Sequence, residues 1–196
     1  MSTLEAKRYN RGMKLLEIAS LKRLRQMLLG EVDGCVLEIG TGTGANLPIY
    51  RATSHVTGID LNGDRLAGTT EREAKRPFSV AVANAHHLPF PNNHFDNVVG
   101  TLVFCSIPHP AQALAEIKRV LQPNGRLYLL EHVRGLNPIT QRLTDWFHPL
   151  WFSLQHECHL NRETAVSVQQ AGFHIERSSA HGWGLLQMLT AVPTNS

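Results

Sequence analysis

An acidic residue and three closely spaced glycines end an apolar segment near residue 40. The segment reads Val36-Leu-Glu-Ile-Gly-Thr-Gly-Thr-Gly44, so Glu38 stands just before the glycines. Glycines let the chain turn sharply and let a ligand lie against the backbone without Cβ clashes. A helix expected to open at Ala45 would direct free N–H groups toward that ligand. The pattern therefore predicts a nucleotide pocket.

The glycines alone leave the nucleotide open, because Gly40-x-Gly42-x-x-Ala45 also fits a degenerate dinucleotide fingerprint. The charge of Glu38 distinguishes a dinucleotide from S-adenosylmethionine. A carboxylate here would repel a pyrophosphate and attract the cationic amine and sulfonium of S-adenosylmethionine. We predict S-adenosylmethionine as the cofactor and S-adenosylhomocysteine as its product. A dinucleotide, or a glycine turn without a ligand, is the alternative.

Two further polar residues follow later apolar segments. Asp60 ends the segment 55–60, twenty residues beyond Gly40, where a βαβ unit would bring a carboxylate to a ribose. A helix N-cap is the alternative role. Asn84 follows the segment 78–83, and its side chain could bond an adenine amine while the Ala85 N–H reaches a ring nitrogen. A plain turn is the alternative for Asn84.

These residues need elements that hold them at one edge. Periodicity predicts that strands and helices alternate, which is typical of an α/β domain with a parallel sheet. In such a sheet the ligand lies at the carboxyl ends of the strands. The expected strands are 35–39, 55–60, 78–83, 95–101, 126–131, 173–178 and 185–191, and the expected helices are 63–75, 110–121 and 162–171.

Composition favours one globular domain over residues 1–196. A chain of 196 residues with 42% hydrophobic content can bury one substantial core. It contains no run of about 20 apolar residues and no apolar signal-peptide region, so we expect a cytoplasmic protein. Three dispersed cysteines disfavour disulfides and structural zinc, and His156-x-Cys158-His159 is a weak metal pattern. We predict no metal site, a small-molecule substrate and no nucleic-acid partner.

The basic residues concentrate at the N-terminus. Residues 1–25 hold seven Lys or Arg against two Glu, a balance of +5 within a total of +3. Residues 1–30 have the spacing of an amphipathic helix, with Lys22, Arg23 and Arg25 on its wet face. We interpret this segment as a helix that covers the substrate side. The alternative is peripheral contact with an anionic membrane.

An aromatic stretch interrupts the α/β pattern after residue 138. Residues 138–162 are interpreted as a lid over the carboxyl edge of the sheet, because they follow the fifth strand and include several aromatic residues. Those aromatics either enclose an apolar substrate or attach the helix to the sheet. Arg162 is expected to pair with Asp145 or Glu163, or to recognise an anionic substrate. His86 and His87 are read as surface residues of a loop.

Four motifs together resemble one family. They are Glu38-Ile-Gly-Thr-Gly-Thr-Gly44, Gly58-Ile-Asp60, Leu88-Pro-Phe90 with Phe95-Asp-Asn-Val-Val99, and Glu116-Ile-Lys-Arg-Val-Leu-Gln-Pro-Asn-Gly125. This set resembles the class I S-adenosylmethionine-dependent methyltransferases of the type 11 branch over residues 35–132. The resemblance implies an α/β, Rossmann-like seven-stranded sheet of order 3-2-1-4-5-7-6, with the last strand antiparallel and helices on both faces. It also implies cofactor contacts from Glu38, Gly40, Thr41, Gly42, Asp60, Leu61, Asn84, Ala85, Thr101 and Leu102.

Later segments of the sequence indicate which members of this family the chain resembles. Leu102-Val-Phe-Cys-Ser106, Glu131-His-Val133 and residues 148–163 are similar to alkyl thiol S-methyltransferases, and bacterial phospholipid N-methyltransferases share much of the core. The resemblance implies methylation of a small, partly apolar acceptor, with a thiol favoured over a phospholipid amine or a quinone-type carbon. A binding protein without catalysis is the alternative class. The oligomeric state is left open.

Methyl transfer needs alignment of the acceptor more than acid–base machinery. A thiol reacts as its thiolate, so an imidazole near the methyl group would help. His132, at the end of the fifth strand, is our first candidate base. Asp145 and His148 on the lid follow, and His109 comes after them.

Overall fold

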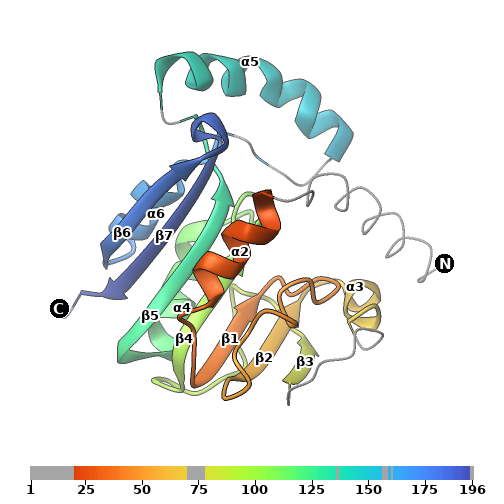
Figure 1. The fold of residues 1–196 in the computed structure, drawn as a ribbon, viewed down its shortest axis with the longest axis vertical. Helices are drawn as coiled ribbons and strands as arrows, with labels where there is room; N and C mark the ends of the chain where they lie inside the picture. The colour runs from red at the N-terminus through yellow and green to blue at the C-terminus, as the bar shows by residue number, and fades with distance from the viewer. Residues whose placement is uncertain (1–19, 70–77, 136, 156–158, 160, 195–196) are drawn as a thin grey trace.

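The computed structural model describes residues 20–69, 78–135, 137–155, 159 and 161–194, with the side chains of residues 150–155 left out. Its centre is one seven-stranded sheet of order β3-β2-β1-β4-β5-β7-β6 (Figure 1). Strands β1 to β5 pair in parallel, and β7 runs antiparallel to both β5 and β6. The fold predicted from the resemblance is confirmed.

The strands are β1 (Cys35–Ile39), β2 (His55–Asp60), β3 (Phe78–Val82), β4 (Phe95–Thr101), β5 (Leu121–His132), β6 (Phe173–His181) and β7 (Leu186–Pro193). The helices are α2 (Lys22–Leu29), α3 (Gly63–Ala67), α4 (Pro110–Val120), α5 (Pro138–Gln155), α6 (Thr164–Gln170) and the short η2 (Gly182–Gly184). Helix α2 lies on one face of the sheet, and α4 and α6 lie on the other (Figure 1).

Three expected boundaries are wrong. The helix predicted from Ala45 is a series of turns over residues 42–49, with successive bonds such as Leu47 N–H to Gly44 O. Helix α3 ends at Ala67 rather than at residue 75, and residues 70–77 lie outside the described residues. Strand β5 starts at Leu121, because the chain pairs with β4 as soon as α4 ends, across a register shift.

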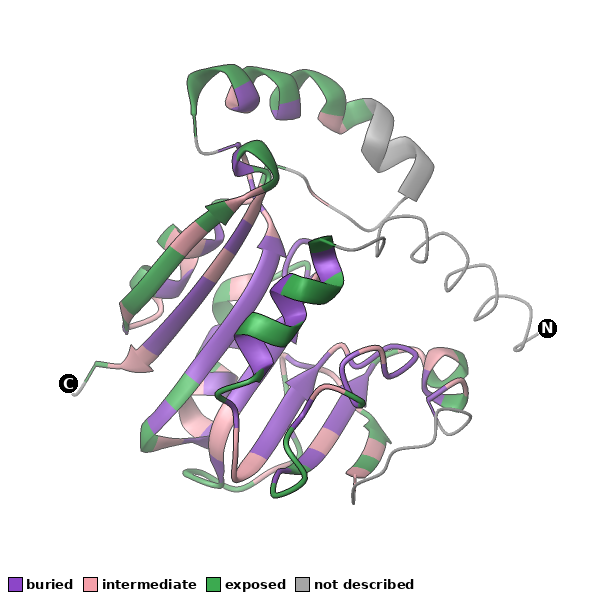
Figure 2. Ribbon diagram, viewed as in Figure 1, coloured by how far each residue is buried: buried purple, intermediate pink, exposed green. Residues whose placement is uncertain are grey.

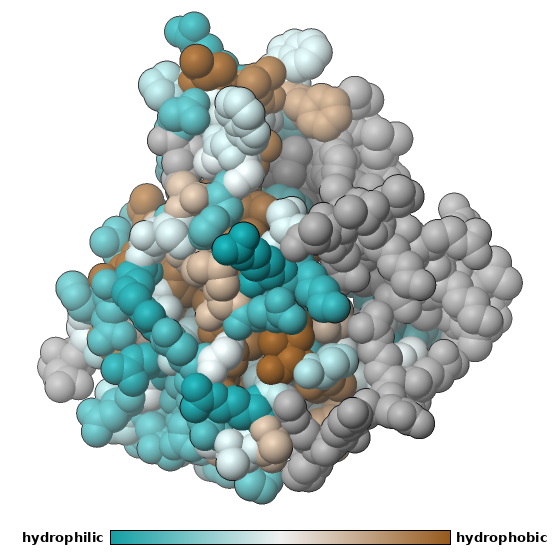
Figure 3. All heavy atoms as spheres, viewed as in Figure 1, coloured by the Kyte–Doolittle hydropathy of each residue, from teal (hydrophilic) through white to brown (hydrophobic). Residues whose placement is uncertain are grey.

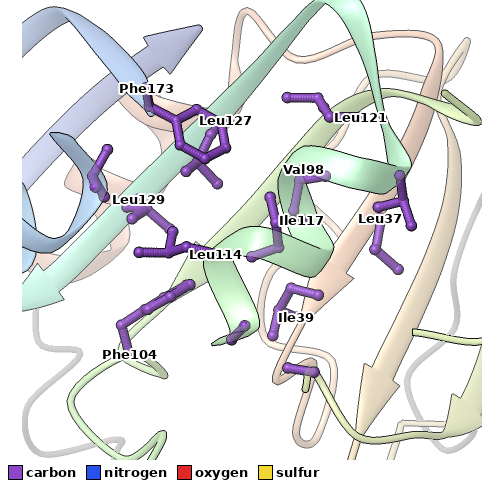
Figure 4. Packing of buried hydrophobic residues seen from close by; sticks show 14 of the residues in the cluster. Leu37, Ile39, Val98, Phe104, Leu114, Ile117, Leu121, Leu127, Leu129 and Phe173 are labelled. Carbon is purple, nitrogen blue, oxygen red and sulfur yellow. The ribbon is translucent and has the colours of Figure 1, made fainter. Parts of the chain in front are cut away.

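The central strands are buried on both faces. Along β1, Val36 packs with the α2 side, whereas Leu37 and Ile39 pack with the α4 side. This alternation follows from the two-residue period of a strand. The middle of the sheet is accordingly purple in Figure 2, and Figure 4 shows Leu114 and Ile117 of α4 against the sheet. The continuous apolar runs of the sequence are typical of such doubly covered strands.

Helix α2 corrects one expectation about the basic N-terminal segment. Lys22 and Arg23 are exposed, but Arg25 is only 5% exposed and lies against the sheet. Its guanidinium donates to the side-chain oxygen of Asn46. Arg25 therefore belongs to the interior rather than to a wet face. Residues 1–19, which carry the rest of the predicted segment, lie outside the described residues.

Helix α5 occupies the segment predicted as a lid and stands apart from the sheet at the top of Figure 1. It continues through Pro149. Among the described residues, no helix combines the length and apolarity that crossing a membrane would require.

Candidate functional site

A cavity of about 460 Å³ lies at the carboxyl ends of β1, β2 and β3, closed on one side by the loop after β4. Its size is within the usual range for small-molecule sites. Most of the lining is apolar, with a few polar groups. The lining residues are Ile39, Gly40, Ile59, Asp60, Leu61, Asn62, Arg65, Ala83, Asn84, Ala85, His86, Val103, Ser106, Ile107, Pro108 and His159.

Asp60 links the glycine turn to the second strand. Its Oδ2 accepts the Gly42 N–H at 3.0 Å and its Oδ1 accepts the Asn62 N–H at 2.9 Å. The N-cap of α3 is Asn62, whose side chain accepts from Asp64 and Arg65. Because Asn62 caps the helix, the alternative N-cap role for Asp60 does not hold. Asp60 is instead fixed at the cavity wall, where a carboxylate could bond a ribose.

The loop after β3 supplies another wall. Asn84 makes a turn, since its Oδ1 accepts the His86 N–H at 2.9 Å, and it also lines the cavity beside Ala85. Of the two histidines expected at the surface, His87 is exposed, whereas His86 lines the cavity. This side chain is half-buried at the cavity, and its Nε2 is buried without a hydrogen-bond partner among the described residues.

Glu38 lies beneath the glycine turn, only 1% exposed. Its two oxygens accept from Asn46 Nδ2 at 3.1 Å and from Tyr50 Oη at 2.8 Å. Burial raises the pKa of Glu38 to about 7, although these bonds and the charge of Arg25 oppose the rise. Glu38 thus orders the turn from below, and direct contact with a cofactor stays a prediction.

The other predicted cofactor residues surround this network. Thr41 donates to the backbone oxygen of Glu38, and Thr101 accepts from Asn46. Leu102 has a φ of 55°, an uncommon conformation for a side chain with a Cβ, and its N–H bonds to Leu130. None of these three appears among the cavity-lining residues, whereas Gly40, Asp60, Leu61, Asn84 and Ala85 do.

Glu131 is a site residue that the sequence interpretation missed. It is 1% exposed at the end of β5, and its Oε1 accepts the Val103 N–H at 3.1 Å. Burial raises the pKa of Glu131 to about 7, while backbone N–H groups of Val103, Phe104 and Cys105 oppose the rise. Glu131 therefore fixes the loop that carries Val103 into the cavity wall. Its position at the carboxyl end of a predicted strand was the one sequence feature that could have identified Glu131 as a site residue.

The opposite rim of the cavity connects to α5 through two histidines. His159 lines the cavity, and its ring centroid lies 5.4 Å from that of His148 on α5. His159 N–H also bonds to Cys105 O, which ties it to the loop after β4. The structure thus brings predicted His148 close to the site. His156 and Cys158 lie outside the described residues.

The other two predicted catalytic residues, His132 and Asp145, do not line the cavity. His132 is half-buried beside Glu131 at the end of β5, paired with Leu186, and it does not line the cavity. Asp145 is bonded to Arg134 at 2.7 Å. The expected pairing of Arg162 with Asp145 or Glu163 is wrong, because Arg134 bonds to both acids and Arg162 donates instead to the backbone oxygen of Ile107.

The residues at the cavity fit the predicted S-adenosylmethionine. The fixed carboxylate of Asp60 suits ribose hydroxyls, and Asn84 with the Ala85 N–H suits an adenine edge. Ile59, Leu61 and Ala83 offer apolar surface to a purine ring. Methyl transfer is the chemistry that such a pocket can support.

Comparison with known proteins agrees with this site. The family model described as Methyltransferase domain matches residues 37–129. The rat protein named thiol S-methyltransferase TMT1B is 32% identical over 183 residues, which is 88% of this chain and 73% of that protein. The human protein named thiol S-methyltransferase TMT1A is 34% identical over 173 residues, which is 80% of this chain and 69% of that protein.

Solved structures show the same fold. The methyltransferase solved in complex with the Haloferax volcanii Trm112 activator superposes with a TM-score of 0.78 at 18% identity. The alignment covers 99% of this chain and 96% of that one.

Proposed function

This chain belongs to the class I S-adenosylmethionine-dependent methyltransferases, and from that premise we propose that it methylates a small, partly apolar thiol. The observation that carries the proposal is the similarity to thiol S-methyltransferases over most of the chain. The apolar cavity wall formed by Val103, Ile107 and Pro108 supports an apolar acceptor. An imidazole at its rim supports a thiol.

The chain's own residues contribute positioning first. S-adenosylmethionine, when bound, supplies a methyl group on a positively charged sulfur. Asp60 and Asn84 orient the donor, and the apolar wall excludes water from the line between acceptor and methyl group. The wall depends on Glu131, which holds Val103 in place.

The second contribution is a proton acceptor. A thiol must lose its proton before its sulfur attacks, because the thiolate is the nucleophile. We assign that proton to an imidazole nitrogen of His159, with His148 packed behind it. The sulfur–methyl bond of the product then forms as the donor's bond to the same methyl group breaks.

The test compares acceptors that differ in one atom. Release of S-adenosylhomocysteine is measured with hexanethiol, hexanol and hexylamine, and then with phosphatidylethanolamine vesicles and a reduced demethylated quinone. We expect turnover with hexanethiol, and its loss in the Asp60→Ala variant. Turnover confined to the phospholipid or the quinone would refute the thiol assignment and leave the family intact.

A further inference from the structure

A buried arginine on α2 lies beneath the glycine turn, although α2 precedes the region 37–129 that matches the methyltransferase family. Helix α2 covers one face of the sheet, and Figure 3 shows mostly hydrophilic atoms over it at the centre of the view. Lys22, Arg23 and Gln26 are exposed, as the outward residues of such a helix should be, whereas Arg25 is 5% exposed. A charge is rarely buried unless it has a specific partner.

The partner of Arg25 is the side chain of Asn46, in the turns that follow the glycines. Arg25 Nη1 donates to Asn46 Oδ1 at 2.9 Å. The amide nitrogen of Asn46 donates in turn to Glu38 Oε1 at 3.1 Å and to Thr101 Oγ1 at 2.9 Å. An amide has one acceptor oxygen and one nitrogen with two N–H donors, so a donor at the oxygen decides which way round the amide lies. Arg25 therefore holds Asn46 in the orientation that lets it donate to both Glu38 and Thr101.

This network joins a cation to an acid away from water. Asn46 and Glu38 are each 1% exposed, Thr101 is 8% exposed, and the buried Tyr50 donates to the second oxygen of Glu38. The positive charge of Arg25 and the hydrogen bonds from Asn46 and Tyr50 all favour the ionised form of Glu38, and burial opposes it. Charges interact more strongly in such an interior than at a wet surface. The charge of Arg25 thus bears directly on the charge of Glu38.

The network lies below the end of the cavity that is left for the methionine part of the donor. Gly40, two residues after Glu38, lines the cavity, and so does Val103, two residues after Thr101. With the ribose at Asp60 and the adenine beyond it, the sulfonium is left to the walls at Gly40 and Val103. A carboxylate beneath those walls favours a positively charged sulfur over a neutral one.

We propose that Arg25 is a positioning residue of the cofactor site, which orients Asn46 and keeps the Glu38 carboxylate ionised beneath the sulfonium of the donor. The site then binds S-adenosylmethionine in preference to S-adenosylhomocysteine, because only the donor carries a charge on its sulfur. Methyl transfer removes that charge, so the product is held less tightly than the donor was. The proposal concerns the donor end alone and holds for any methyl acceptor.

Calorimetry of both ligands from about pH 5.5 to about pH 8.5 tests the proposal on the full chain. The quantity measured is the dissociation constant of S-adenosylhomocysteine divided by that of S-adenosylmethionine. Burial raises the pKa of Glu38 to about 7, so in wild type this ratio should rise with pH as Glu38 ionises. Arg25→Gln keeps an N–H donor and removes the charge that lowers the pKa of Glu38. We expect Arg25→Gln to reduce the ratio roughly three- to tenfold near pH 7 and to move its rise to higher pH.

Three matched variants separate this role from a structural one. Arg25→Lys keeps the positive charge and should retain the rise of the ratio near its wild-type pH. Arg23→Gln removes an exposed charge from the same helix and should match wild type at every pH. Glu38→Gln should leave only the titration of the ligands' own amines, which is common to all variants, and adding Arg25→Gln to it should not change the ratio further. Melting temperatures report any loss of stability separately.

Three results would overturn the proposal. The first is an equal weakening of both ligands by Arg25→Gln with the pH dependence of wild type, which would make Arg25 a structural residue only. The second is a change in the ratio that Arg25→Gln produces as fully in the Glu38→Gln background, because Arg25 would then act without Glu38. The third is the same pH dependence of the ratio in wild type and Glu38→Gln. None of these results bears on the thiol acceptor, which is tested by turnover.

Discussion

The substitution Glu131→Gln isolates the cost of a buried carboxylate beneath the cavity wall. The amide oxygen of glutamine can accept the Val103 N–H as the carboxylate does. The amide nitrogen replaces Oε2, which has no hydrogen bond of normal geometry among the described residues, although the N–H groups of Phe104 and Cys105 lie close enough to favour the charged carboxylate. The variant therefore keeps the shape of the site and removes one ionisable group.

The magnitude follows from the pKa of Glu131, which burial raises from 4.5 to about 7. Between these values the folded protein retains a proton that the unfolded chain releases, so stability falls as pH rises. From about pH 5 to about pH 8 one such group lowers the free energy of unfolding by roughly 2–3 kcal/mol. Glu38, whose pKa burial also raises to about 7, contributes equally in wild type and variant.

Urea unfolding at several pH values measures this difference. We expect the fall in unfolding free energy across the range to be smaller in Glu131→Gln by about 2–3 kcal/mol. The control Glu163→Gln removes the carboxyl group of a side chain that is 58% exposed, and its pH dependence should follow that of wild type. The same pH slope in Glu131→Gln and wild type would refute the assignment of a buried, protonated carboxyl.

Three further variants test the site. Asp60→Ala should weaken S-adenosylmethionine binding by about 1–3 kcal/mol in calorimetry, because hydrogen bonds to the ribose are lost. The control Asp64→Ala, on the exposed start of α3, should bind as wild type does, and equal affinities of the two variants would remove Asp60 from the site. His159→Ala should reduce kcat with hexanethiol more than His132→Ala does, because only His159 lines the cavity, and the reverse order would restore His132 as the candidate base. Arg119→Ala should lower the free energy of unfolding near pH 7 by about 1–3 kcal/mol, since Arg119 bonds to Glu116 and to the backbone oxygens of Leu88 and Phe90. The Arg119 guanidinium lowers the pKa of Glu116 to about 2, so this loss of stability should shrink as the pH falls toward that value. A loss that does not depend on pH, or an equal loss in Lys118→Ala, would contradict this prediction.

Local sequence patterns were sufficient to locate the seven strands, although not the start of β5, and the order of the strands followed from the family resemblance. Apolar runs marked β1, β2 and β4 because these strands are covered on one or both faces. The spacing of Asp60 from the glycines placed it at the cavity wall, since a βαβ unit fixes that distance.

Contacts between distant segments could not be predicted in the same way. The partnership of Arg25 with Asn46, and of Glu131 with Val103, joins residues more than twenty positions apart. Nothing local distinguishes Arg25 from the exposed Arg23 on the same helix.

The most direct test is a crystal structure of the protein grown with S-adenosylhomocysteine. We predict electron density in the cavity, with ribose hydroxyls at Asp60 and the adenine beside Asn84 and Ala85. Density in the groove between α2 and strands β6 and β7, where Met27, Arg177 and Met188 line a separate hollow, would contradict it.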